Sequence, residues 1–299
     1  MKPEAAKPIR RYAIGAAQFE PENLAPGLYI VATPIGNLGD MTIRGLAALA
    51  AAEVILCEDT RTTAKLLDRF AIRNRLEPYH EHNAAKARPG ILRRLMDGAA
   101  MALVSDAGMP LVNDPGYRLV REAIAGNIAV TCCPGASAVF TALALSGLPT
   151  DRFGFFGFFP QKPGERQRLF AELKPLRSTL IFFESPHRIV ETLRDIAIAF
   201  PGRQLAVARE LTKLHEEVLR GTATEIADVL AARPSVKGEI TLLIGPPDEA
   251  AETAGEDEIE AAIAEAIKAM PAGQAAGEVA RRLHLNRRQV YARILARPK

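Results

Sequence analysis

The 299-residue sequence lacks several features that would place it outside the cell or in a membrane. No apolar run approaches the roughly 20 residues of a membrane-spanning helix, and residues 1–26 lack the apolar core of a secretory signal peptide. The cysteines Cys57, Cys132 and Cys133 form neither a CxxC pair nor a disulfide framework, so we expect buried thiols. These absences favour a cytoplasmic protein.

Short motifs that mark several enzyme classes are also absent. The sequence contains no GxxxxGK[ST] of P-loop nucleotidases, no GxGxxG after a strand, no GxSxG elbow and no HExxH. His80 and His82 alternate on an extended segment, but the sequence offers no third metal ligand beside them, so we expect no metal site. The net charge of +3 is too small to indicate nucleic-acid binding by itself.

Apolar, strand-like runs alternate with helical patterns along most of the chain. The runs lie at 27–32, 53–57, 99–104, 128–133, 179–183, 204–208 and 239–245. Strand, loop and helix repeated at this spacing predict an α/β fold with a mostly parallel sheet covered by helices. We expect a flexible tail over 1–26, an N-terminal α/β domain over 27–149, a C-terminal α/β domain over 150–247, and an acidic linker with a basic helical segment over 248–299.

The loop Ser105–Gly116, SDAGMPLVNDPG, is the most distinctive of the strand-end loops. It is about twice as long as the two to six residues of an ordinary connection, and its glycines and prolines make it stiff. Open α/β sheets bind ligands beyond the carboxyl ends of their strands, so this loop is a candidate ligand site. The alternative is a long surface turn in which Asp106 and Asp114 only cap backbone amides.

Carboxylates follow several predicted strands and are candidates for a general base or a hydroxyl anchor. They are Asp59, Asp106, Glu184 and Glu210. The chain offers few residues for covalent chemistry, which favours group transfer by orientation and desolvation. Each carboxylate also has a structural alternative. Asp59 or Thr60 fits the N-cap of the following helix, and Ser185-Pro186 fits the N-cap and first position of another.

The charge of the chain changes sign near its C-terminus. Residues 248–258 are acidic, 259–270 form an amphipathic helical pattern, and 273–299 hold seven Lys or Arg against one Glu. Two short helices with Asn286 as an N-cap would resemble a helix-turn-helix. A basic appendage of this kind fits a nucleic-acid contact, and a packing or dimerisation element fits the pattern equally well.

Seven motifs occur in a fixed order between Gly27 and about Gly245. They are TPIGNLGD, EDTR, SDAGMPLVNDPG, PGASA, FFESPHR, ARELTKLHEE and KGEITLLI. Together they resemble the tetrapyrrole-methylase-like superfamily of S-adenosylmethionine-dependent methyltransferases. TPIGNLGD stands where tetrapyrrole methylases carry a GAGPGD-like loop, which favours the branch that methylates the ribose 2′-hydroxyl of a decoding-centre cytidine in small-subunit ribosomal RNA. The basic C-terminal segment also looks like that branch.

The resemblance implies two α/β domains, S-adenosylmethionine in the cleft between them, and a homodimer. It further implies a set of cofactor contacts at the positions that match the motifs. These are Pro34, Ile35, Gly36, Ser105, Asp106, Ala107, Gly108, Pro110, Ser137, Ala138, Phe183, Glu184, Leu211, Thr212, Gly238, Glu239 and Ile240.

A ribose hydroxyl is a poor nucleophile at neutral pH, so a base or hydrogen-bond acceptor is expected beside it. Asp59 and Glu184 are the candidates, and water is the alternative. The remaining candidates would contact RNA. Phosphate groups would be held by Arg61, Arg188 and Lys213, and the acceptor side would be lined by His80, His82 and Asn83. The C-terminal segment would aid recognition of the folded RNA through Arg281, Arg282, Arg287, Arg288 and Arg293.

Two rival functions are compatible with the same fold. One is a small-molecule methyltransferase acting on a tetrapyrrole, against which the basic C-terminal segment argues. The other is a non-catalytic RNA-binding factor in ribosome assembly, which would bind RNA without transferring a methyl group.

Overall fold

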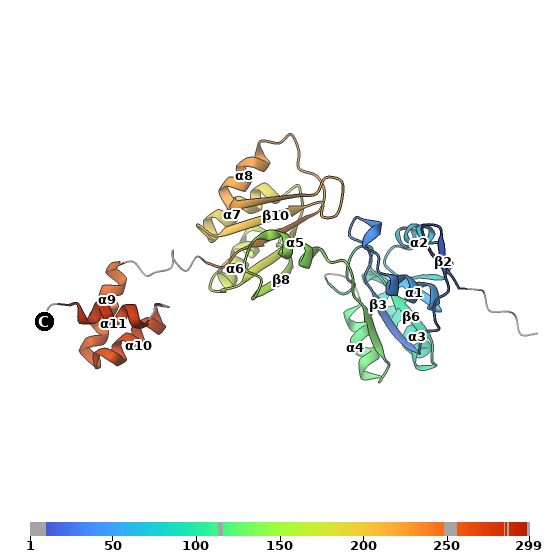
Figure 1. Ribbon diagram of the computed structural model, residues 1–299, viewed down its shortest axis with the longest axis horizontal. Coiled ribbons are helices and arrows are strands. Elements are labelled where there is room, and N and C mark those ends of the chain that lie inside the picture. The colour runs from blue at the N-terminus through green and yellow to red at the C-terminus, as the bar shows by residue number, and fades with distance from the viewer. Residues whose placement is uncertain (1–9, 113–115, 248–255, 284, 286, 298–299) are drawn as a thin grey trace, which may run out of the picture.

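The computed structural model describes residues 10–112, 116–247, 256–283, 285 and 287–297 (Figure 1). Its main body contains two five-stranded sheets, and three further helices follow them in the chain. No helix in these described ranges is both long and apolar enough to cross a membrane.

The first sheet is parallel throughout, as the sequence predicts. Its order is β5 (Leu76–Pro78), β4 (Val54–Cys57), β6 (Ala100–Leu103), β3 (Gly27–Val31) and β7 (Val130–Cys133). The connecting helices are α1 (Ile43–Ala51), α2 (Thr60–Arg69), α3 (Glu81–Met96) and α4 (Tyr117–Ala125), with a short 3-10 turn at Leu38–Asp40. Because α1 and α2 cover one face and α3 and α4 the other, β4 and β6 are apolar and buried at every position.

The prediction of a flexible tail is wrong for part of residues 1–26. β1 (Tyr12–Ile14) and β2 (Ala17–Phe19) form an antiparallel hairpin in which the rings of Tyr12 and Phe19 stack 5.3 Å apart. Tyr12 is buried against α1, and the amide of Ala13 donates to the carbonyl of Phe70 over 2.7 Å. Strands of three residues are too short to give a periodic signal, so the sequence pattern missed them. Residues 1–9 lie outside the described residues.

The expectation that all three thiols are buried is also wrong. Cys57 and Cys133 are buried, but Cys132 is exposed. β7 is an edge strand of the first sheet, so it has a neighbouring strand on one side, and Thr131 and Cys132 both remain open to solvent.

The second sheet is mainly antiparallel, a direction that the sequence pattern did not specify. Its order is β11 (Glu217–Thr222), β10 (Gln204–Arg209), β12 (Ile240–Ile244), β9 (Thr179–Glu184) and β8 (Phe153–Phe158). β8 and β9 are parallel, and the other three pairs are antiparallel. The reason is that β10 returns directly into β11 without a crossover helix. β11 was not predicted, because Glu217, Arg220 and Gly221 interrupt its apolar pattern.

Helices cover both faces of the second sheet. α6 (Pro163–Leu173), α7 (Ile189–Ala199) and α8 (Ala223–Ala231) pack on one face. α5 (Ala138–Ser146) packs on the other, where Ala142 and Leu143 contact Ile181, Ala206 and Leu243 (Figure 1). α5 follows β7 of the first sheet in the chain but packs on the second sheet. The domain boundary expected between residues 149 and 150 therefore falls after a helix that packs with the second sheet.

An ion-pair cluster on the β10–β11 hairpin gives a prediction about acid stability. Glu217 accepts from Arg233 over 2.6 and 2.8 Å and from Arg209 over 3.0 Å, and these guanidinium groups, Arg233 first, lower the pKa of Glu217 to about 2. A lowered folded-state pKa contributes stability above the ordinary pKa of 4.5 that is lost as the pH falls towards 2. We expect Glu217→Gln to lower the free energy of unfolding at pH 7 by about 1 kcal/mol, because solvent screens this partly exposed cluster.

Urea denaturation at pH 7 and at pH 3 checks this prediction. The difference between wild type and Glu217→Gln should be smaller at pH 3. Glu172→Gln, an exposed change on α6, is the matched control and should be neutral at both pH values. A Glu217→Gln effect that does not shrink with acid would contradict the assignment.

The three C-terminal helices form a small core of their own. α9 (Glu256–Ala269), α10 (Ala272–Arg282) and α11 (Arg287–Leu295) bury one another's apolar faces, including Ile263, Val279 and Val290. The two short helices predicted after the amphipathic helix are confirmed. The predicted cap Asn286 lies outside the described residues, as does Asp114 of the long loop.

Candidate functional site

A cavity of about 360 Å³ lies between the two sheet domains. The loops after β3 and β6, the start of α5, the end of β9 and the start of β12 all contribute to its wall. The carboxyl ends of the parallel strands of the first sheet therefore face one side of the cavity, where open α/β sheets bind ligands. Its volume lies within the range of small-molecule sites.

The lining contains most of the residues that the family resemblance implies as cofactor contacts. Those in the lining are Ile35, Ala107, Gly108, Ser137, Ala138, Phe183, Glu184, Gly238, Glu239 and Ile240. Those outside it are Pro34, Gly36, Ser105, Asp106, Pro110, Leu211 and Thr212.

Sequence reasoning missed several lining residues. They are Met109, Val112, Val139, Phe158, Ser185, Pro186 and Thr241. Met109 and Val112 belong to the long loop, and Ser185 and Pro186 to FFESPHR, so taking each motif whole would have found them. Phe158 carried no signal, because nothing in an aromatic strand distinguishes a cavity wall from a core.

The cavity wall is mainly apolar, and its polar groups lie at a few positions. Ile35, Val139 and Phe183 supply apolar surface, and the first turn of α5, whose backbone amides have no partner within the helix, belongs to the lining. Ser137 is the N-cap residue of α5, and within the described chain its side chain caps none of these amides. Such a wall fits a ligand with a flat apolar part and a small charged part.

Two loops of the first domain are joined behind the cavity. The backbones of Thr33 and Gly108 exchange hydrogen bonds of 2.9 and 3.0 Å, and the Thr33 hydroxyl donates to the Ser105 carbonyl over 3.1 Å. Asp106 Oδ1 accepts the amide of Asp59 over 3.1 Å, so its carboxylate caps a backbone amide, as the structural alternative proposed. The loop nevertheless reaches the cavity through Gly108 and the residues beside it.

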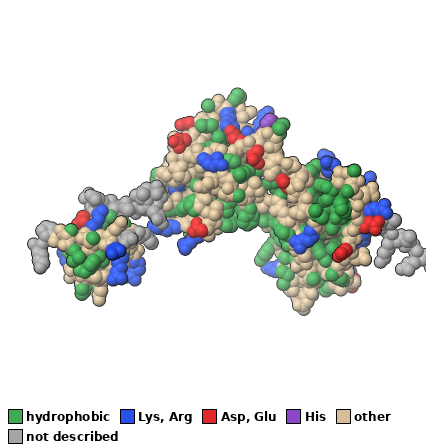
Figure 2. Space-filling view, in the orientation of Figure 1, with side chains coloured by type: hydrophobic (Ala, Val, Ile, Leu, Met, Phe, Trp, Pro, Cys, Tyr) green, Lys and Arg blue, Asp and Glu red, His purple; other side chains and the backbone are tan. Residues whose placement is uncertain are grey.

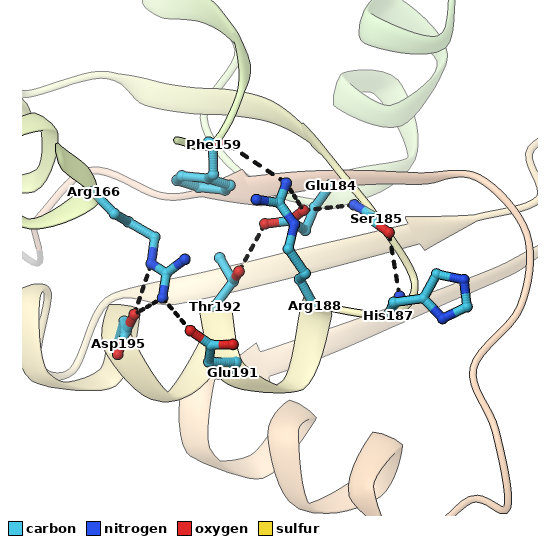
Figure 3. A network of polar contacts seen from close by, with 9 residues as sticks. All are labelled: Phe159, Arg166, Glu184, Ser185, His187, Arg188, Glu191, Thr192 and Asp195. Atoms are coloured by element: carbon cyan, nitrogen blue, oxygen red, sulfur yellow. Dashed lines mark hydrogen bonds and ion pairs between the residues drawn. The ribbon is translucent and has the colours of Figure 1, made fainter. Parts of the chain in front are cut away.

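The carboxylate of Glu184 is fully engaged (Figure 3). Its side chain is 0% exposed, and Oε1 accepts from the Ser185 amide and from Arg188 Nη2, each over 2.6 Å. Oε2 accepts from the Thr192 hydroxyl over 2.7 Å. Because both oxygens already have donors, this geometry suits an anchor that ties the end of β9 to α7 rather than a base.

Arg188 is partly occupied within the protein, since Nη2 has partners while the buried Nη1 has none among the described residues. Besides Glu184, its Nη2 contacts the carbonyl of Phe159 over 3.4 Å. Arg188 is also the N-cap residue of α7, so the expected N-cap at Ser185 is wrong. The Ser185 hydroxyl instead accepts the amide of His187 over 3.3 Å in the turn before the helix. This turn leaves Ser185 and Pro186 in the cavity wall.

Asp59 caps α2, as one of the structural alternatives predicted. Its Oδ1 accepts the Arg61 amide over 2.8 Å, and its two oxygens accept from the Arg61 guanidinium over 3.1 and 2.7 Å. Hydrogen bonds from the side chain and then the backbone of Arg61 lower the pKa of Asp59 to about 2. The carboxylate is therefore ionised at neutral pH and lies outside the cavity lining.

The pairing of Asp59 with Arg61 can be tested by titration. Arg61→Met should raise the pKa of Asp59 from about 2 towards its ordinary 3.8, but not fully, because the amide at position 61 still donates. Carboxyl NMR of the full chain measures both midpoints. Arg69→Met, exposed in the last turn of the same helix, should leave the Asp59 pKa unchanged. An unchanged pKa in Arg61→Met would contradict the pairing.

The predicted acceptor-side residues follow β5, the edge strand of the first sheet that pairs with β4. The amide of Tyr79 donates to the Cys57 carbonyl over 2.7 Å, which places the end of β5 beside the end of β4. The rings of His80 and His82 meet edge to face at 5.9 Å. Asn83 accepts the His80 amide over 2.9 Å and so helps to begin α3. In the described ranges no three His, Cys, Asp or Glu side chains are grouped to hold a metal ion.

The other basic residues predicted to contact RNA already have partners in the chain. Lys213 Nζ contacts Glu210 over 2.7 Å and Glu239 over 2.8 Å. Arg282 pairs with Glu265 over 3.0 Å, and Arg281 pairs with Glu278. Arg287 donates to the carbonyl of Gly273 over 3.2 Å, while Arg288 and Arg293 are exposed. Figure 2 shows Lys and Arg side chains gathered on one side of the C-terminal bundle.

Comparison with known proteins defines the class. Residues 27–227 match the family described as Tetrapyrrole (Corrin/Porphyrin) Methylases, and the chain belongs to this family. Residues 253–298 match the RsmI C-terminal HTH domain. The chain is 46% identical over 283 residues to Ribosomal RNA small subunit methyltransferase I of Mesorhizobium japonicum, covering 94% of this chain and 96% of that protein.

Solved structures share the fold at low identity. The methyltransferase CobJ matches with a TM-score of 0.56 and 20% identity, over 74% of this chain and 94% of that one. A uroporphyrin-III C-methyl transferase from Thermus thermophilus, complexed with S-adenyl homocysteine, matches with a TM-score of 0.50 and 19% identity, over 73% and 97%. These likenesses support the two-domain α/β fold.

Proposed function

We propose that the protein transfers a methyl group from S-adenosylmethionine to the ribose 2′-hydroxyl of a cytidine in the decoding region of 16S ribosomal RNA. One observation carries the proposal: a single chain matches both the methylase body and the C-terminal helical domain of an enzyme named for the small ribosomal subunit. The sheet domains supply a cavity for a small cofactor, and the C-terminal helices supply a basic surface for RNA.

The cavity residues fit S-adenosylmethionine. Its apolar wall, with Ile35, Val139 and Phe183, suits the adenosine part, and the amides of the first turn of α5 suit a carboxylate. A solved structure with the same fold holds the demethylated form of this cofactor. When bound, the cofactor supplies a methyl group on a sulfonium, which an oxygen can attack directly.

The protein's own contribution is to exclude water and to orient the acceptor. We propose Asp59 as the hydrogen-bond acceptor for the ribose hydroxyl, because it is ionised, follows the carboxyl end of β4 and, unlike the fully buried Glu184, keeps 30% of its side chain exposed beside its bonds to Arg61. Its low pKa makes it a weak base, so water takes the proton. Glu184 serves as the anchor of the Ser185–Pro186 wall, since both its oxygens already accept hydrogen bonds.

We also propose that the protein acts in the cytoplasm as a homodimer, with the exposed Arg288 and Arg293 contacting RNA. The rings of Phe140 and Phe153 lie 5.8 Å apart, on α5 and β8, and both remain exposed. Exposed aromatic side chains in contact with each other suit burial against a second copy.

A methyl-transfer assay tests the proposed function. The protein is incubated with radiolabelled S-adenosylmethionine and one of three acceptors: small ribosomal subunits, naked ribosomal RNA or a porphyrin. The porphyrin is included because the family description names corrin and porphyrin methylases. Label in ribosomal RNA is expected. Label only in the porphyrin would favour a tetrapyrrole methyltransferase, and RNA binding without label would favour a non-catalytic factor.

A further inference from the structure

Two loops, one from each domain, meet at a contact directly after Ile35, which lines the cavity. The amide of Asn37, in the loop after β3, donates to the Thr212 hydroxyl over 3.1 Å. A Cβ on Gly36 would lie 2.5 Å from Lys213 Cγ and 2.9 Å from Thr212 Oγ1, so only glycine permits this approach. We call the contact of Gly36 and Asn37 with Leu211, Thr212 and Lys213 the interdomain latch.

The latch holds a strained residue. Thr212 has a φ of +65°, and nearby Glu210 has a φ of +53°. A β-branched residue in this left-handed region is a conformational outlier that its surroundings must maintain. Here the Thr212 amide donates to Glu216 Oε2 over 2.6 Å while its hydroxyl receives the Asn37 amide. Strain of this kind is found where a fixed side-chain position is needed.

Hydrogen bonds connect the latch to the cavity wall of the second domain. Lys213 Nζ bridges Glu210 and Glu239 over 2.7 and 2.8 Å. Glu210 and Glu239 are joined again by two hydrogen bonds of 3.0 Å, one between their backbones and one from the Glu239 amide to Glu210 Oε1. Glu239 and its neighbour Gly238 line the cavity.

The other side of the latch connects to the opposite wall. Ile35, which precedes Gly36, lines the cavity from the first domain. Ile35 also packs in one buried cluster with Leu211, the residue before Thr212. The latch therefore lies between two cavity walls that come from different domains, although Gly36, Leu211 and Thr212 are outside the lining themselves.

We infer that Thr212 is a positioning residue, whose hydroxyl closes the latch and holds the two cavity walls at the separation at which the ligand binds. The inference rests on the proposed function for the identity of that ligand, S-adenosylmethionine. It gives Thr212 and Lys213 a different role from the cofactor and phosphate contacts that the sequence implied.

Thr212→Val tests this role, because valine keeps the branched shape and removes the acceptor oxygen. In the full chain without ligand, hydrogen exchange at the Asn37 amide should become faster. Isothermal titration should show a Kd for S-adenosylmethionine raised about fivefold, the effect of one lost hydrogen bond. Thr212→Ser keeps the hydroxyl and should restore both values to near wild type.

Two further variants distinguish loss of the latch from general destabilisation of the protein. Gly36→Ala places a methyl group against Thr212 and Lys213, which should separate the same two loops and also weaken S-adenosylmethionine binding. This variant tests the latch independently if Thr212→Val fails to fold. Thr222→Val removes a hydroxyl that accepts an amide at the N-cap of α8, remote from the cavity lining, and should leave the Kd unchanged.

An unchanged Kd and an unchanged Asn37 exchange rate in Thr212→Val would overturn the inference. If the wild-type chain itself fails to bind S-adenosylmethionine, the proposed function falls instead. In that case hydrogen exchange at the Asn37 amide alone tests the latch. An exchange rate that is unchanged in Thr212→Val would overturn the inference.

Discussion

Arg188→Met is expected to lower the free energy of unfolding by about 3 kcal/mol, because it leaves the buried Glu184 carboxylate without its cation. Glu184 is fully buried, and Arg188 is its charged partner at 2.6 Å, whereas Ser185 and Thr192 supply neutral donors (Figure 3). Urea denaturation of the full chain at neutral pH measures the loss.

Two comparisons make this result specific to the ion pair. Arg194→Met changes an exposed arginine on the same helix and should alter stability by no more than about 0.5 kcal/mol. The double variant Glu184→Gln/Arg188→Met should be more stable than Arg188→Met alone, since no unpaired charge remains. A neutral Arg188→Met would show that Glu184 is not held as described.

Ala138→Phe is expected to weaken S-adenosylmethionine binding by about a hundredfold, because the ring would fill much of a small site and displace ligand contacts. Ala138 opens α5, is only partly buried and lines the cavity of about 360 Å³, so the larger side chain has room in the folded protein only where the ligand would lie.

Isothermal titration with the full chain measures this effect. Ala144→Phe places the same ring on an exposed position of the same helix and should bind as the wild type does. Wild-type affinity in Ala138→Phe would place the cofactor outside this cavity and would remove the structural basis of the proposed function.

The first domain could be predicted from the sequence because its signals are local. Each strand is a short apolar run, and each is followed by a polar loop and a helical pattern, which together require parallel neighbours. The direction of the strands in the second sheet was not predictable in this way. It depends on the β10–β11 hairpin, whose second strand contains Glu217, Arg220 and Gly221 and gives no apolar alternation.

The site was predictable as a set of motifs but not as a set of roles. The motifs brought Gly108, Ala138 and Gly238 to one cavity, and the capping role of Asp59 follows from its place before a helix. The role of Glu184 depends on a donor eight residues away on α7, at Thr192, and its burial depends on packing between elements. Sequence spacing carries no information about such contacts.

The most direct test of the central claim is mass spectrometry of nucleosides from the decoding region of small-subunit ribosomal RNA. Cells that lack this protein should lack the 2′-O-methyl group on one cytidine there. Wild-type protein should restore it, and Ala138→Phe should not. A methyl group that persists without the protein, or that Ala138→Phe restores fully, would contradict the account.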